Sequence, residues 1–116
     1  MKLRVYVAGP LTSPTQEGEE HNAQRAMEAG AQLLLAGLCP FIPHLTLWFD
    51  RYVRATGIVL GHAGYLAWDF GWLDVCDALL YLGPSPGADE ERSRAEAQGI
   101  PVFETVEEVL TWAQGQ

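Results

Sequence analysis

The sequence of 116 residues has little positive charge: one lysine and six arginines stand against 15 acidic residues, and the formal net charge is −8. A protein that binds a nucleic-acid polymer needs a basic face, so this composition argues against DNA or RNA strands as the ligand. A single nucleoside or nucleotide remains a candidate, because a few backbone N–H groups can hold one phosphate.

Cysteine is equally scarce. Cys39 and Cys76 lie far apart in the chain and have no metal-ligand spacing, and the three histidines and the acidic residues show none either. We therefore expect both cysteines to be small buried residues. We also expect no metal and no organic cofactor.

Long hydrophobic runs are missing as well. No apolar segment reaches the roughly 18 residues that span a membrane. Nothing resembles a signal peptide, because residues 1–4 lead straight into a predicted strand. These absences predict a soluble, cytoplasmic protein without a membrane partner. Hydrophobic residues nevertheless make up 48% of the chain, which is enough to build the core of a single domain over 1–116.

Apolar runs and helical patterns alternate along the chain. Short apolar runs predict strands at 3–7, 39–42, 78–82 and 100–103. Helices are predicted at 14–37, 63–76, 88–98 and 105–112, with a short helix and a loop in 44–60. This alternation predicts a three-layer α/β/α fold, flavodoxin-like or Rossmann-like, with an open, mostly parallel sheet of four to five strands. Right-handed crossovers favour the strand order 2-1-3-4.

In that order the first and third strands end side by side at the carboxyl edge, where open parallel sheets bind ligands. Gly9 and Pro10 follow the first strand and allow a backbone to approach a ligand closely, and Thr12 adds a hydroxyl. An ordinary strand-to-helix turn explains the same residues. The segment is neither a Walker A loop nor a GxGxxG fingerprint.

The segment after the third predicted strand begins a helix. There the N–H groups of Gly87 and Ala88 are expected to point at an anion, and Ser85 to donate a hydrogen bond. Glu91 falls in or just after the first turn, where the positive helix end favours its ionised form. A positioned carboxylate of this kind can act as a nucleophile at a sugar carbon. The alternative is that the acids at 89–91 are solvated residues matched to the helix dipole.

Asp69 lies within an apolar and aromatic stretch, where a carboxylate needs a partner or a role. Trp72 is its neighbour on the helix surface. An exposed aspartate on an amphipathic helix is the alternative. For Asp77 we expect a structural role in a turn or cap. His44 ends the second strand and either lines the same edge or is a half-exposed loop histidine, and His62 is expected to cap a helix.

Taken together, these segments resemble the nucleoside 2-deoxyribosyltransferase-like superfamily, which includes the transferases, the 2′-deoxynucleoside 5′-monophosphate N-glycosidases and small uncharacterised relatives. The first strand with Gly9 and Pro10 looks like the family's first strand and glycine loop. Asp69, Leu73 and Asp77 are similar to its pattern D-x-x-x-(I/L)-x-x-x-D. Residues 87–91 and 99–102 are similar to G-(T/A)-x-x-E followed by G-(K/I)-P-(V/I). The resemblance covers most of the chain and is poor over 44–61.

The resemblance implies chemistry at a glycosidic bond. Glu91 would be the nucleophile at C1′ of the sugar, forming a glycosyl-enzyme ester that water or another base releases. Asp69 would handle the proton of the leaving base or orient that base. The implied substrate-binding residues are Tyr6, Gly9, Pro10, Thr12, His44, Trp72, Ser85, Gly87 and Ala88, with Tyr6 touching the nucleophile.

Position 85 bears on the substrate. Transferases that act on free nucleosides tend to have an aspartate six residues before the nucleophile, whereas the monophosphate hydrolases resemble this chain in having a serine. Ser85 can donate to a phosphate that an aspartate would repel, which favours a nucleotide 5′-monophosphate. The family completes its sites across a subunit interface, so a homodimer or larger assembly is expected.

Two alternatives remain. The first is a non-catalytic nucleotide-binding or sensor module of the same fold. It is favoured by the polar run 92–94 after Glu91 and by Leu11-Thr12-Ser13, which stand where the hydrolases often have a basic residue. The second is a different α/β protein that binds a small molecule.

Overall fold

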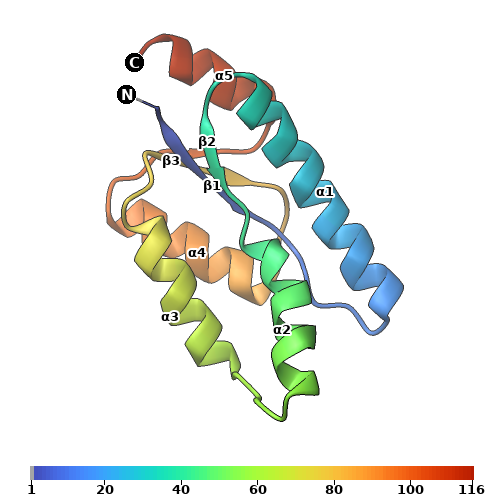
Figure 1. Cartoon of the computed structure of the whole chain (residues 1–116). Coiled ribbons are helices and arrows are strands. Elements are labelled where there is room, and N and C mark those ends of the chain that lie inside the picture. The colour runs from blue at the N-terminus through green and yellow to red at the C-terminus, as the bar shows by residue number, and fades with distance from the viewer. Residues whose placement is uncertain (1) are drawn as a thin grey trace.

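The computed structural model describes residues 2–116 and contains a parallel sheet between layers of helices (Figure 1). The strands are β1 (Arg4–Ala8), β2 (Cys39–Phe41), β3 (Ala78–Tyr81) and β4 (Val102–Phe103). Their order is β2-β1-β3-β4, and every neighbouring pair is parallel. The predicted fold class and strand order are confirmed.

The helices are α1 (Gln16–Leu35), the short 3₁₀ helix η1 (Pro43–Leu45), α2 (Thr46–Ala55), α3 (His62–Leu73), α4 (Pro86–Ala97) and α5 (Val106–Gln114). Three of them begin with a hydroxyl cap, from Thr15, Ser85 and Thr105. The stretch 44–60 is more helical than its sequence indicated, because η1 runs directly into a ten-residue α2. Within residues 2–116 no helix combines the length and hydropathy needed to cross a membrane.

Alternate residues of the central strands pack against different helices. Val5, Val7 and Leu80 join the core formed with α1 and α5. Tyr6 and Leu79 face the other way, into the core formed with α3 and α4. This period of two gives each face of the sheet its own hydrophobic layer, as expected of a parallel sheet covered on both sides.

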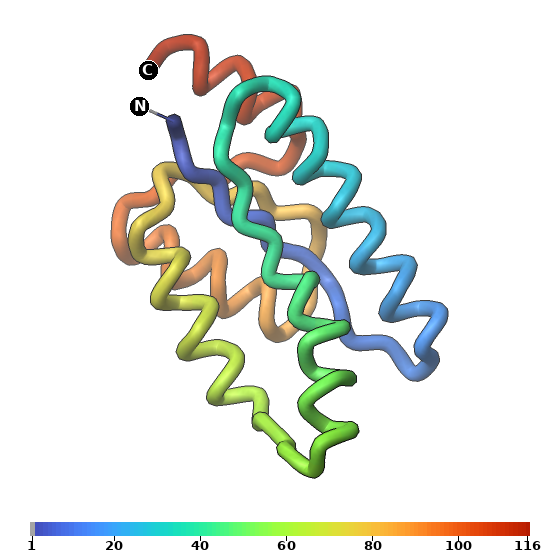
Figure 2. Tube along the Cα trace, in the orientation of Figure 1, coloured from blue at the N-terminus to red at the C-terminus, as the bar shows by residue number. Residues whose placement is uncertain are grey.

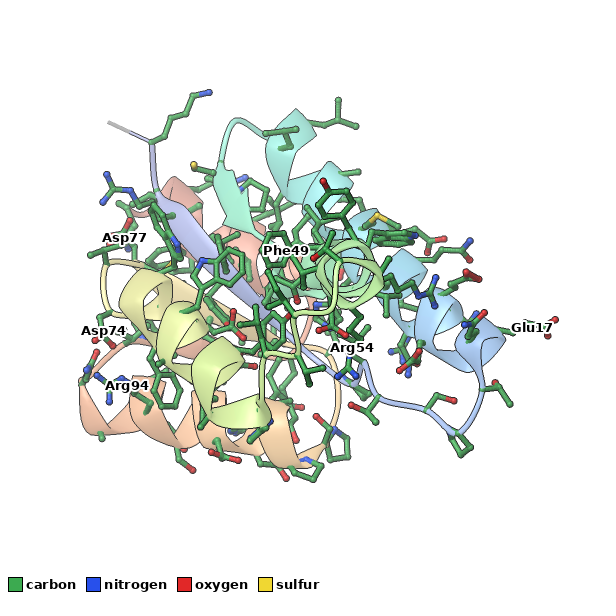
Figure 3. All side chains as sticks on the ribbon, turned by 60° about the horizontal axis from the view of Figure 1, so that its bottom comes forward. Glu17, Phe49, Arg54, Asp74, Asp77 and Arg94 are labelled. Carbon is green, nitrogen blue, oxygen red and sulfur yellow. The ribbon has the colours of Figure 1, made fainter. Side chains whose placement is uncertain are left out.

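Helix α4 packs on the sheet although its sequence is mostly polar. Ala88, Glu91 and Ala95 form the stripe that is buried, so small side chains bring the helix close to β1 and β3. Arg94 anchors the outer side through two hydrogen bonds of 2.7 and 2.8 Å to Asp74, and the two side chains face each other in Figure 3. The polar residues after Glu91 therefore coexist with a buried position for Glu91 itself.

Two expectations about single residues have different outcomes. Asp77 has a structural role as predicted, but it connects distant segments and does not cap a turn or helix: its Oδ2 accepts the backbone N–H of Arg4 at 2.8 Å. Cys39 was expected to be buried, and this is wrong: Cys76 is buried, but Cys39 is exposed at the start of the edge strand β2. An edge strand has a neighbour on one side only, which leaves its first residue in contact with solvent.

The tube in Figure 2 shows that α2 and α3 extend away from the sheet and meet at a turn, far from the carboxyl end of α5. This turn covers residues 56–61 and includes Gly57, whose φ of 92° is a conformation that glycine adopts without strain. Helices α2 and α3 thereby form walls beyond the carboxyl edge of the sheet.

Candidate active site

A cavity of about 710 Å³ lies at the carboxyl edge, beyond the ends of β1 and β3. Its walls come from the loop after β1, from η1, α2 and α3, and from the start of α4. This volume suits a small organic ligand. Eight of the residues singled out from the sequence line it: Gly9, Thr12, His44, Asp69, Ser85, Gly87, Ala88 and Glu91.

Glu91 is buried, with 6% of its surface exposed, and it lines the cavity from α4. Burial raises the pKa of Glu91 from 4.5 to about 8, and the charges of Asp69 and Glu90 add to the increase. The expectation that the helix dipole keeps Glu91 ionised is therefore wrong. Because α4 begins at Pro86, Glu91 lies in the second turn, where the dipole is weaker than the cost of desolvating a carboxylate.

Tyr6 comes from the middle of β1 and is fully buried. Its hydroxyl donates a hydrogen bond to Oε2 of Glu91, which opposes the increase in the Glu91 pKa. Burial and the neighbouring carboxylates raise the pKa of Tyr6 far above 10, so the phenol keeps its proton as a permanent donor. Its ring stacks on Phe41 at 5.5 Å, which fixes the direction of the hydroxyl.

Asp69 reaches the cavity from α3 and is half-buried. Burial raises the pKa of Asp69 to about 6, against the opposing effect of His62. Its Oδ1 is buried, and no group in residues 2–116 donates to it. A buried acceptor without a donor costs free energy, which a ligand that supplies an N–H or O–H can recover. The alternative of a fully exposed aspartate does not hold.

His44 is 3% exposed, so the alternative of a half-exposed loop histidine does not hold either. Its Nε2 lies 3.0 Å from the carbonyl oxygen of Gly9, and burial lowers the pKa of the ring. A neutral ring that donates from Nε2 has an unprotonated Nδ1 as an acceptor. That Nδ1 is buried and has no partner among the described residues.

The start of α4 differs from the anion site expected there. Ser85 is the N-cap, and its Oγ accepts the N–H of Ala88 at 3.1 Å. Its carbonyl accepts the N–H of Asp89 at 2.8 Å. Pro86 has no N–H to offer. The expectation that Ala88 directs its N–H at an anion is wrong. Among the described residues of this turn, Gly87 keeps an N–H without an acceptor.

Other sequence-predicted residues lie at the edge of the cavity or outside it. A Cβ on Gly9 would lie 3.0 Å from Cβ of Leu82, so glycine here allows close packing of that side chain. Pro10 is outside the lining, and Trp72 stacks on Phe41 at 5.7 Å with half of its surface exposed. His62 was expected to cap α3, but Gly61 holds that position.

Sequence reasoning missed the carboxylate of Asp50, which lines the cavity from α2. Its Oδ1 accepts the hydroxyl of Tyr65 at 2.7 Å, and its Oδ2 accepts Nε of Arg54 at 2.6 Å. The spacing of four residues between Asp50 and Arg54 was the available signal, since such pairs are neighbours on a helix. This spacing brings the two side chains together only because residues 46–55 form a helix.

These features define a three-layer α/β/α protein whose cavity at the carboxyl edge is built around two carboxyl groups, Glu91 and Asp69. Among residues 2–116, no group of three or more histidine, cysteine or acidic side chains is placed to hold a metal ion. A scan against protein-family models and a search of curated proteins both find no match for this chain.

Proposed function

We propose that the protein cleaves or transfers the N-glycosidic bond of a 2′-deoxynucleoside or 2′-deoxynucleotide. The observation that supports this most directly is the buried Glu91, whose carboxyl group receives a hydrogen bond from Tyr6 and shares the cavity with Asp69. A nucleophile of this kind needs a fixed direction and a dry environment, and the tyrosine and the burial supply both.

The reaction would proceed in two steps. The Glu91 carboxylate attacks C1′ of the sugar, the C1′–N bond breaks, and the departing base takes its electron pair with a proton from Asp69. The resulting ester is then released by attack of water or a second base at C1′, with Asp69 accepting a proton. A pKa of about 6 for Asp69 suits a group that both gives and takes a proton near neutral pH.

The proposal includes a homodimer or larger assembly. Exposed hydrophobic residues gather on α2, on the segment that follows it and on α3: Trp48, Phe49, Tyr52, Ile58, Val59 and Trp68. Phe49 packs edge-on against Trp68 at 5.3 Å, so the two helices share one apolar surface beside the cavity. Exposed apolar patches of this kind mark interaction sites. Sedimentation equilibrium of the wild type and of Tyr52→Glu tests the assembly. A wild type that sediments as a monomer contradicts it.

The catalytic proposal is tested by release of free base from paired deoxynucleosides and deoxynucleoside 5′-monophosphates. Glu91→Gln preserves the shape of the side chain but removes the nucleophile, so release should fall by at least about 1,000-fold. Glu90→Gln is the matched control, because Glu90 is exposed on the same turn. Equal loss in both variants, or full activity in Glu91→Gln, contradicts the nucleophile assignment.

A second candidate is a non-catalytic nucleotide-binding module. It is favoured by the raised pKa of Glu91, because a group with a pKa of about 8 is mostly protonated at neutral pH. In the same experiment, such a module would release no base from any substrate, yet a nucleoside would raise the melting temperature of the protein.

A further inference from the structure

The charges on the cavity walls bear on the class of substrate. Four acidic side chains line the cavity: Glu19, Asp50, Asp69 and Glu91. Among the described residues that line the cavity, Arg54 alone carries a permanent positive charge. A ligand with a phosphate dianion would enter a site where negative groups outnumber positive ones.

The guanidinium of Arg54 is already paired. Its Nε lies 2.6 Å from Oδ2 of Asp50, and Tyr65 holds the other carboxylate oxygen at 2.7 Å. The hydrogen bonds from Tyr65 and Arg54 keep the pKa of Asp50 below its usual value, so this carboxylate stays ionised. The nearby Arg51 lies outside the lining and contacts Glu20 at 3.0 Å and Glu19 at 3.7 Å.

The start of α4 supplies little that would bind a phosphate. At the start of α4, Ser85 uses its side chain and its carbonyl to hold the N–H groups of Ala88 and Asp89. The N–H of Gly87 remains, and Asp89 and Glu90 follow it in the helix. A phosphate site at a helix start normally uses several free N–H groups together.

Two residues that line the cavity have a buried polar atom without a hydrogen-bond partner within residues 2–116, and both atoms are acceptors. Nη2 of Arg51 also lacks a hydrogen-bond partner, but Arg51 lies outside the lining. Asp69 Oδ1 and His44 Nδ1 are both buried without a donor. A deoxynucleoside and its 5′-monophosphate share the base and the 3′-hydroxyl that can supply donors to these atoms. They differ at the 5′ position, where a hydroxyl is a donor but a phosphate dianion has only acceptor oxygens. A dianion near Glu91 would also favour its protonated form and so weaken the nucleophile.

We propose that the substrate is an uncharged deoxynucleoside with a free 5′-hydroxyl, an inference that rests on the proposed function. Asp50 excludes the 5′-monophosphate by neutralising the charge of Arg54. This is opposite to the substrate that Ser85 suggested from the sequence. In the structure the oxygen of Ser85 serves as a helix cap, a role that does not depend on a phosphate.

The test compares kcat/KM for one deoxynucleoside and its own 5′-monophosphate. The wild type should favour the nucleoside by at least about tenfold, and the ratio should shrink with added salt, which screens repulsion. Asp50→Asn removes one negative charge from the cavity wall and leaves Arg54 without its carboxylate partner. The ratio of kcat/KM for the nucleoside to kcat/KM for the monophosphate should therefore fall by at least about threefold. Asp74→Asn breaks a similar arginine pair outside the cavity and should leave the ratio unchanged.

The outcomes separate the two proposals. Preference for the monophosphate, or equal narrowing in Asp50→Asn and Asp74→Asn, overturns the inference about charge and leaves the glycosidic chemistry standing. Release from neither compound overturns the proposed function. In that case calorimetric titration of the wild type with the same two compounds decides the charge class, since tighter binding of the monophosphate overturns it.

Discussion

Replacing Glu91 with glutamine should remove the loss of stability that this carboxyl group causes between pH 6 and pH 8. Burial raises the pKa of Glu91 from 4.5 to about 8, so the folded protein keeps a proton that the unfolded chain has already released. A carboxyl group with a raised pKa destabilises the fold progressively as the pH rises from the unfolded to the folded value.

The magnitude follows from these two pKa values. At about 1.36 kcal/mol per pKa unit, Glu91 alone should lower the free energy of unfolding by roughly 2 kcal/mol between pH 6 and pH 8. Asp69 has a pKa of about 6 in the folded protein, so it is largely ionised in both states over most of this range. Its contribution over the same interval is therefore small beside that of Glu91.

Urea unfolding of the wild type, Glu91→Gln and Glu90→Gln at both pH values tests this reasoning. Between pH 6 and pH 8 the free energy of unfolding should fall by about 2 kcal/mol more in the wild type than in Glu91→Gln. Glu90→Gln should lose slightly less than the wild type, because the charge of Glu90 adds to the raised pKa of Glu91. Glutamine can still accept the hydrogen bond from Tyr6, which limits other effects of the substitution. Parallel losses in all three proteins would show that Glu91 is not buried as an uncharged group.

Three further predictions concern the same site. First, kcat/KM for base release should follow a bell-shaped pH profile with limbs near 6 and 8, because the reaction needs a protonated Asp69 with an ionised Glu91. A rate that only increases through pH 8 would mean that Asp69 acts as a carboxylate. Second, Tyr6→Phe removes the hydrogen bond that lowers the Glu91 pKa, so the alkaline limb should move to higher pH; an unmoved limb contradicts this. Third, Gly9→Ala brings a Cβ within 3.0 Å of Cβ of Leu82. It should cost about 1–3 kcal/mol in urea unfolding, and combination with Leu82→Ala should recover part of that cost.

The order of elements was predictable because its signals are local. Short apolar runs separated by capped helices predicted the parallel sheet. Of the predicted capping box, the Thr105 hydroxyl accepts the N–H of Glu108 at 3.1 Å, whereas the Glu108 carboxylate accepts the Thr105 hydroxyl at 3.1 Å rather than its backbone N–H. Helix α2 was harder to predict, because no side chain caps its start and its aromatic residues are exposed. Helix propensity alone carries little information without such end signals.

For the site, the sequence indicated which residues meet at the carboxyl edge. Strand order places the ends of β1 and β3 together, so Gly9, Ser85 and Glu91 had to be close. The contact of Tyr6 with Glu91 was expected from the family resemblance and is present, but no local pattern could indicate it, because these residues are 85 positions apart. Nor could the sequence show that Asp50 pairs with Arg54 beside them, since that required α2 to fold against this edge.

Local patterns in the chain account for the kinds of element, their order and the candidate residues, since hydrophobic periodicity and caps act over a few neighbouring positions. The protonation states of the site and its unpaired hydrogen-bonding atoms arise from packing between distant segments. Burial, which no local pattern encodes, raises the pKa of Glu91 and leaves Asp69 and His44 with unpartnered atoms. Desolvation depends on everything that packs around a group, so the chemistry of this cavity is a property of the fold as a whole.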